Sequence, residues 1–157
     1  MLLLKAMIFS DSHRDFSSIF RAMEQEGTVD YIIHAGDVHK DVEDIEAYWR
    51  TTPCISVLGN NDYSVWGIPT RREFVLEGKK FLLTHGHLYG VKSSLARLHQ
   101  EAASCNADVC IFGHTHRHCL EEHNGIWFLN PGASPSHYAV IEIQDGQMDI
   151  QIKDTPY

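Results

Sequence analysis

The chain has 157 residues, of which 43% are hydrophobic and 22% are charged, as in one ordinary globular domain. Its formal net charge of −8 argues against a basic nucleic-acid groove, because binding a phosphate backbone needs clustered lysine and arginine. We therefore predict a single domain over residues 1–157, and the sequence has no strong nucleic-acid signature.

Short apolar runs alternate with helical patterns in the first part of the chain. Buried strands are predicted at residues 6–10, 31–35 and 54–58. Two apolar stripes with helical spacing lie between them, formed by Phe16, Ile19, Phe20 and Met23 and then by Val42, Ile45 and Trp49. This strand–helix–strand order predicts parallel strands with helices packed outside.

The second part of the chain has a different pattern. Residues 73–77 and 80–84 flank a Gly78-Lys79 turn and predict a hairpin, and residues 91–104 predict a helix. A buried strand follows at 108–112. The dipeptides Asn124-Gly125 and Asp145-Gly146 then mark two further hairpins, so that the chain ends in antiparallel strands. The expected fold is a mixed α/β domain of two packed sheets with helices outside.

The four cysteines form no C-x-x-C pair, and we interpret them as buried thiols in a reducing compartment. The N-terminal MLLLKAMIFSD lacks a basic region and a cleavage site, so it reads as a strand and not as a signal peptide. No stretch approaches the roughly 18 apolar residues of a membrane span. We therefore expect a cytoplasmic protein with no membrane partner.

Five apolar runs end in a polar group that can bind metal. The side chains concerned are Asp11 and His13, Asp37, Asn60, His85, and His114 and His116. The first four motifs, each taken alone, are typical of a turn, a helix cap or a core histidine, whereas His114-Thr115-His116 alone fits a metal site equally well. Ligands collect beyond the carboxyl ends of strands in α/β folds, however, and all five motifs occupy that position.

These donors comprise two carboxylates, one amide oxygen and four imidazoles. Such a set suits Mn²⁺, Fe²⁺, Zn²⁺, Co²⁺ or Ni²⁺, and seven side chains are too many for one tetrahedral zinc. They fit two divalent ions that share a bridging carboxylate, about 3.5–4 Å apart. We expect Mn²⁺, with the other four as alternatives.

The order of these motifs resembles the calcineurin-like metallophosphoesterases, and within them the small YfcE-like phosphodiesterases. The resemblance runs from residue 6 to about residue 134 and includes Asn130-Pro131-Gly132. It implies a four-layer α/β/β/α sandwich of two mixed sheets. It also implies a hydrolase that cleaves phosphodiesters through attack by a hydroxide bridging two metals.

The resemblance further implies a division of the ligands. One ion would take Asp11, His13 and His116; the other would take Asn60, His85 and His114, and Asp37 would bridge them. His118 lies outside the motif and is expected at the surface.

Three further residues are candidate catalytic groups. The family usually has histidine, and its YfcE-like group commonly cysteine, where this chain has Asn61. An amide cannot act as a general acid near pH 7, so we predict a preference for leaving groups that need little protonation. Arg14 replaces the usual glycine after the first motif and either reaches a substrate phosphate or is solvated. His87 either contacts substrate or has a structural role.

Alternative functions start from the same residues. A phosphomonoesterase would use the same site, and a protein-interaction scaffold of this fold would have lost catalysis. The chain lacks the Asp-His that a metallo-β-lactamase needs after His116, and it is too short for the roughly 250-residue barrel of an amidohydrolase. A small phosphate ester is the expected substrate, and homo-oligomerisation is left open.

Overall fold

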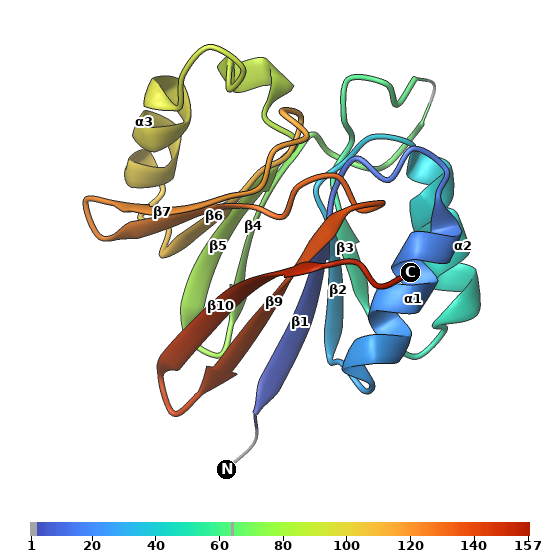
Figure 1. The fold of residues 1–157 in the computed structure, drawn as a ribbon. Coiled ribbons are helices and arrows are strands. Elements are labelled where there is room, and N and C mark those ends of the chain that lie inside the picture. Colours follow the sequence, from blue (N-terminus) through green and yellow to red (C-terminus); the bar gives the residue numbers. More distant parts are fainter. Residues whose placement is uncertain (1–2, 64) are drawn as a thin grey trace.

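The computed structural model describes residues 3–63 and 65–157, which form two five-stranded sheets packed face to face (Figure 1). The first sheet has the order β10-β9-β1-β2-β3. Its strands are β1 (Leu4–Phe9), β2 (Tyr31–His34), β3 (Cys54–Ser56), β9 (His137–Gln144) and β10 (Gln147–Asp154). The three strands β1, β2 and β3 are parallel, and the hairpin of β9 and β10 adds antiparallel to β1.

The second sheet has the order β4-β5-β6-β8-β7. Its strands are β4 (Arg71–Leu76), β5 (Lys79–Thr84), β6 (Val109–Ile111), β7 (Cys119–His123) and β8 (Ile126–Asn130). Strands β5, β6 and β8 are parallel, while β4 and β7 are antiparallel edges. Both sheets are therefore mixed, with a parallel centre.

Helices cover the outer faces of the two sheets (Figure 1). Helices α1 (Phe16–Glu26) and α2 (His39–Tyr48) pack on the first sheet, and α3 (Ala96–Ser104) packs on the second, beside the short 3₁₀ helix η1 (His87–Tyr89). Asp15 caps α1 by accepting the Ser18 N–H. An apolar cluster that includes Ile8, Ile33 and Leu83 fills the space between the sheets. The result is the predicted α/β/β/α sandwich.

Three local predictions were wrong in detail. The turn between β4 and β5 is Glu77-Gly78, one residue earlier than predicted, because a two-residue type I′ turn needs positive φ at both central positions. Helix α3 begins at Ala96 and not at residue 91, because residues 91–93 form a turn and the Ser94 hydroxyl accepts the Ala96 N–H just before the helix. Strand β8 pairs with β6 in parallel, although its hairpin with β7 is antiparallel.

The parallel strands at the centre of each sheet determine where the motif-bearing loops lie. Strands β1, β2 and β3 of one sheet and β5 and β6 of the other end in the five motif-bearing loops. Hydrogen bonds from Asp11 N to Gly36 O (3.1 Å) and from Gly113 N to His85 O (2.9 Å) join neighbouring loops. Within the described parts of the chain, no helix is both long and apolar enough to cross a membrane.

Candidate metal centre

The structure brings three predicted ligands together in a first group, which consists of Asp11, His13 and His116. The Nε2 atoms of His13 and His116 are 3.3 Å apart, and His116 Nε2 is 3.4 Å from Asp11 Oδ1. Asp11 is fully buried, whereas the two histidines are exposed. These atoms come from the loops after β1 and β6, so the two sheets build this group jointly.

The other predicted ligands surround His85, which is also fully buried. Its Nε2 atom lies 3.1 Å from Asn60 Oδ1, 3.3 Å from His114 Nδ1 and 3.6 Å from Asp37 Oδ2. It is also 3.7 Å from Asp11 Oδ1. Asp11 thus belongs to both groups of converging atoms, while the bridging role of Asp37 stays a prediction.

Two features of these atoms fit divalent ions. Asp11 Oδ1 is buried and has no hydrogen-bond partner among the described residues, which is costly for a carboxylate unless a cation neutralises it. In addition, two nitrogens bound to one ion at about 2.1 Å would lie about 3.4 Å apart at a tetrahedral angle. The separations of 3.3 Å between His13 and His116 and between His85 and His114 agree with that value.

The glycines before the ligands are required for space. A Cβ at Gly59 would lie 2.1 Å from Asp37 Oδ1, and a Cβ at Gly113 would lie 1.9 Å from Ser10 Oγ and 2.9 Å from Asp11 Oδ2. Real Cβ atoms do not approach other atoms so closely. The glycines therefore let neighbouring loops pack directly against the two carboxylates.

The backbone at the ligands is unusual for residues with side chains. Left-handed φ angles occur at Asp11 (52°), His13 (48°), Asp37 (72°), His114 (72°) and His116 (62°). Such angles are uncommon outside glycine, and clusters of them occur where function requires a particular side-chain direction. The strain is therefore concentrated at the candidate metal centre.

Hydrogen bonding and burial favour the metal-binding form of the histidines. His85 Nδ1 lies 2.9 Å from Ala35 O and must donate to that carbonyl, which leaves the Nε2 lone pair facing the centre. Burial, followed by the charges of His85 and Lys92, lowers the pKa of His114. Burial and then His85 likewise lower the pKa of His87. Neutral imidazole is the form that binds metals.

The three candidate catalytic residues lie around this centre in different ways. Asn61 donates from its side-chain Nδ2 to Asp37 Oδ2 (2.9 Å) and from its backbone to Asp37 Oδ1 (3.0 Å). The His87 ring is centred 5.5 Å from that of His85. Arg14 is exposed, and its guanidinium has no partner in the parts of the chain that the structure describes. Asn61 thus contacts a predicted ligand directly.

Asp62 is a site residue that the sequence reasoning did not assign. Its carboxylate accepts backbone N–H groups from Gly59 (2.8 Å), Asp37 (3.2 Å) and His39 (2.6 Å). It therefore ties the loop after β3 to the loop after β2 and fixes the backbone of Asp37. Its position directly after Asn60-Asn61 was the available signal.

We expect Asp62→Ala to weaken metal binding by about 10–100-fold, as loss of a group that orients a ligand typically does. Asp62→Asn keeps an acceptor oxygen and should lose less. Calorimetric titration of the metal-free variants with Mn²⁺ measures both. An unchanged affinity in Asp62→Ala would show that Asp37 needs no such support.

A buried hydrogen-bonded chain supports the loop after β1. His34 Nδ1 accepts the Gly36 N–H, so its Nε2 carries the proton and donates to Ser12 Oγ (2.9 Å). Ser12 then donates to Asp41, which also accepts the Arg14 N–H. Burial lowers the pKa of His34 to about 4 and raises the pKa of Asp41. No spacing in the sequence signals this chain.

The lowered pKa of His34 predicts acid destabilisation. Between its ordinary pKa of 6.5 and its folded pKa of about 4, the unfolded chain binds a proton here that the folded chain does not. Neutral His34 therefore makes its full contribution to the free energy of unfolding above pH 6.5. This contribution, about 3 kcal/mol in total, is lost as the pH falls toward 4. Denaturant unfolding of metal-free His34→Asn, which retains an acceptor for Gly36, should show a shallower acid slope. An unchanged slope would assign the acid sensitivity to other groups.

Asn130, in the motif Asn130-Pro131-Gly132, supports the loop that carries His114 and His116. Its buried Nδ2 donates to Gly113 O (3.2 Å) and Thr115 Oγ1 (3.0 Å). Its Oδ1 accepts the Gly132 N–H (2.9 Å). The last motif of the predicted series is therefore structural and holds the preceding one in place.

The model of the calcineurin-like phosphoesterase superfamily domain matches residues 4–146. A probable metallophosphoesterase of Bacillus subtilis is 29% identical, over 96% of this chain and 91% of its own length. A phosphodiesterase of Methanocaldococcus jannaschii is 30% identical, over 82% of this chain and 83% of its own length.

Solved structures show the same fold. A predicted phosphoesterase of Streptococcus pneumoniae superposes with a TM-score of 0.80 at 27% identity, covering 99% of this chain and 91% of that one. Vacuolar Protein Sorting 29 of Cryptosporidium parvum superposes with a TM-score of 0.77 at 18% identity, covering 98% of each chain. At that identity the second likeness concerns the fold alone.

Proposed function

The chain belongs to the calcineurin-like phosphoesterase superfamily, and on that premise we propose that it hydrolyses phosphodiesters at a centre of two divalent metal ions. One observation carries the proposal above all others. Seven potential ligands from five separate loops converge around the buried side chains of Asp11 and His85, and one oxygen of the Asp11 carboxylate has no hydrogen-bond partner among the described residues. An arrangement that leaves a buried anion uncompensated is explained by a cation.

The proposed ligand sets are those implied by the sequence. Asp11, His13 and His116 would hold one ion; Asn60, His85 and His114 would hold the other, with Asp37 between them. Two bound ions would supply an acidified water as nucleophile and would polarise the phosphoryl oxygens. They would also outweigh the two carboxylates, which lets an anionic ester enter a protein with a net charge of −8.

The remaining residues position these ligands and the substrate. Asn61 holds Asp37 through two hydrogen bonds and offers no ionisable proton. Ala35 O orients His85, and Asp62 fixes the loop of Asp37. The exposed Arg14 guanidinium is available to a substrate phosphate.

The nitrogen and oxygen donors suit Mn²⁺, with Fe²⁺, Zn²⁺, Co²⁺ and Ni²⁺ as alternatives. The four cysteines are free thiols, and burial raises the pKa of Cys54 to about 12. Only Cys110 is fully buried and the other three are partly buried, which corrects the expectation of four buried thiols. Free thiols are in keeping with the reducing cytoplasm, which is the location we propose.

Two alternatives define the test of this function. A phosphomonoesterase would cleave an aryl monoester faster than the matching diester, and a scaffold would bind metal without turning over either. Metal-stripped protein titrated with Mn²⁺ should gain activity toward 4-nitrophenyl phosphodiesters in proportion to the metal bound. Full metal binding with no turnover of either ester would contradict the enzyme proposal.

Asn61 predicts a dependence on the leaving group. Asn61→His would supply a general acid, an effect of about 10²-fold or more where protonation limits the rate. Relative to Asn61→Ala, which only removes the amide, we expect it to accelerate an alkyl phosphodiester far more than a nitrophenyl one. Equal effects on both esters would remove leaving-group protonation from the role of position 61. Metal content should be measured in both variants, because Asn61 also contacts Asp37.

A further inference from the structure

A cavity of about 470 Å³ lies against the loop that carries His114 and His116. Thr115 lines it and stands between the proposed ligands His114 and His116. Lys92 also lines it and is near enough to His114 to act on that ring electrostatically. The cavity therefore adjoins the loop that holds two of the proposed ligands.

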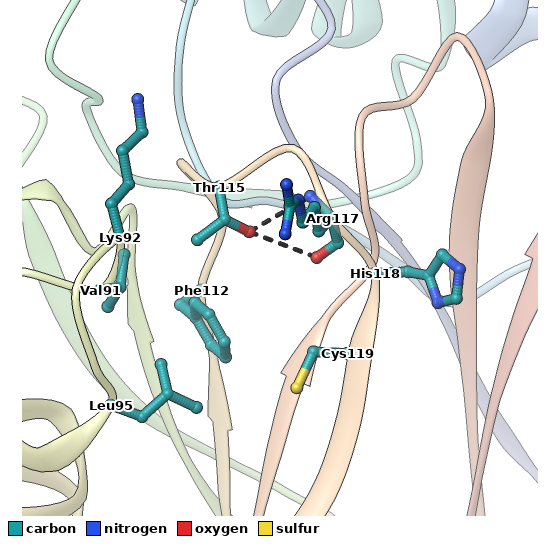
Figure 2. A pocket seen from close by; sticks show the side chains of 8 residues that line it. All are labelled: Val91, Lys92, Leu95, Phe112, Thr115, Arg117, His118 and Cys119. Carbon is teal, nitrogen blue, oxygen red and sulfur yellow. Dashed lines mark hydrogen bonds between the residues drawn. The ribbon is translucent and has the colours of Figure 1, made fainter.

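One side of the cavity is apolar. Val91 and Leu95 reach it from the segment before α3, Phe112 from the residue after β6, and Cys119 from the start of β7. In Figure 2, Leu95, Phe112 and Cys119 lie together in the lower part of the view. The Cys119 thiol stays protonated, because burial and then Glu121 raise its pKa. This side therefore favours a flat apolar body.

The other side of the cavity is cationic. Lys92 and Arg117 line it, and Figure 2 shows the Lys92 ammonium at the upper left of the view and Arg117 beside Thr115. Neither charged group has an ion-pair or hydrogen-bond partner among residues 3–63 and 65–157, although the chain carries a net charge of −8. Two unpaired cations beside an apolar surface form a suitable site for an anionic group on an apolar body.

We propose that this cavity is a specificity subsite for one arm of the phosphate ester, and that it selects an arm with a flat apolar body ending in a second anionic group. Its volume is that of a small-molecule site and leaves room for a ring and an anion. The inference rests on the proposed function, because the reacting phosphate must be held at the metals. It identifies Lys92, Arg117 and Leu95 as the residues that distinguish one ester from another.

The test uses ligands that cannot be hydrolysed, so that binding is measured apart from turnover. The full chain loaded with Mn²⁺ is titrated by calorimetry with methylphosphonate, benzylphosphonate and 4-carboxybenzylphosphonate. We expect about tenfold tighter binding for the benzyl than for the methyl compound, from apolar burial. The carboxylate should add about another fivefold, and this increment should shrink as salt is raised.

Variants show which side of the cavity supplies each gain in affinity, the one from the benzyl group and the one from the carboxylate. Lys92→Gln/Arg117→Gln should remove the carboxylate increment and keep the benzyl-to-methyl ratio, and Leu95→Asn should do the reverse. The affinities of the three phosphonates are compared as ratios within each variant, so a change that affects all three equally does not alter the result. The control is Arg50→Gln/Lys79→Gln, which removes the same charge at the opposite ends of the strands, because Arg50 precedes β3 and Lys79 begins β5. It should keep both increments.

The outcomes separate this inference from the proposed function. Equal affinities for the three phosphonates, no binding of 4-carboxybenzylphosphonate, or a carboxylate increment that survives Lys92→Gln/Arg117→Gln would overturn the subsite. Turnover of activated esters alongside such a result would leave the hydrolase standing. The expected ratios without turnover of any ester would support the subsite and contradict the hydrolase.

Discussion

Replacing His116 by alanine should lower turnover of a 4-nitrophenyl phosphodiester by about 10³-fold or more. A metal ion in such a site contributes several kcal/mol of transition-state stabilisation, and each 1.36 kcal/mol corresponds to about tenfold in rate. His116 Nε2 lies 3.3 Å from His13 Nε2 and 3.4 Å from Asp11 Oδ1. Loss of His116 should therefore prevent the proposed ion from binding to Asp11 and His13. Its side chain is 49% exposed, so the metal-free fold should persist.

The matched control is His123→Ala, which removes another exposed histidine in a strand away from the centre. His123 lies in β7 and stacks on His99 at 3.9 Å, and we expect turnover within about twofold of wild type. Initial rates, bound Mn²⁺ and thermal unfolding should be measured on both variants. Full activity in His116→Ala would remove this histidine from the site.

Gly59→Ala should disrupt the candidate ligands around His85 through steric conflict alone. The new Cβ would lie 2.1 Å from Asp37 Oδ1 and 2.6 Å from Asp37 N, so both the carboxylate and its backbone must move. Forced packing of this kind costs about 1–3 kcal/mol in stability. We expect activity to fall by about 10²-fold or more, since Asp37 would leave its position beside His85.

Gly146→Ala separates a loss of stability from a loss of the site. Gly146 has a φ of 77°, and nothing lies within 4 Å of the added Cβ, so alanine there costs about 1 kcal/mol through the backbone alone. It should keep full activity and full metal content. If Gly59→Ala also bound two metals and kept its rate, the close packing of Gly59 on Asp37 would be irrelevant to function.

The fold and the convergence of the candidate ligands were predictable because both follow from local patterns. Buried strands such as β1 and β2 end sharply at a polar residue, and parallel strands deliver such residues to one edge. The hairpin turns at Asn124-Gly125 and Asp145-Gly146 followed from their need for positive φ, which both pairs adopt. These features depend on few residues at short range.

Other features depend on contacts between distant segments and could not be read from spacing. The hydrogen-bonded chain from His34 through Ser12 to Asp41 joins the end of β2, the loop after β1 and helix α2, and none of its members stands in a motif that signals it. The parallel pairing of β8 with β6 joins strands that are not consecutive in the chain, so no local turn signals it. The cavity beside Thr115 is built from segments around α3, β6 and β7, so its shape required the structure.

The central claim is that two ions occupy this centre, and anomalous diffraction from crystals grown with Mn²⁺ tests it most directly. We predict two manganese peaks, one in contact with Asp11, His13 and His116 and the other with Asn60, His85 and His114. Asp37 should lie between the peaks. A single peak, or manganese bound only elsewhere on the molecule, would contradict the account.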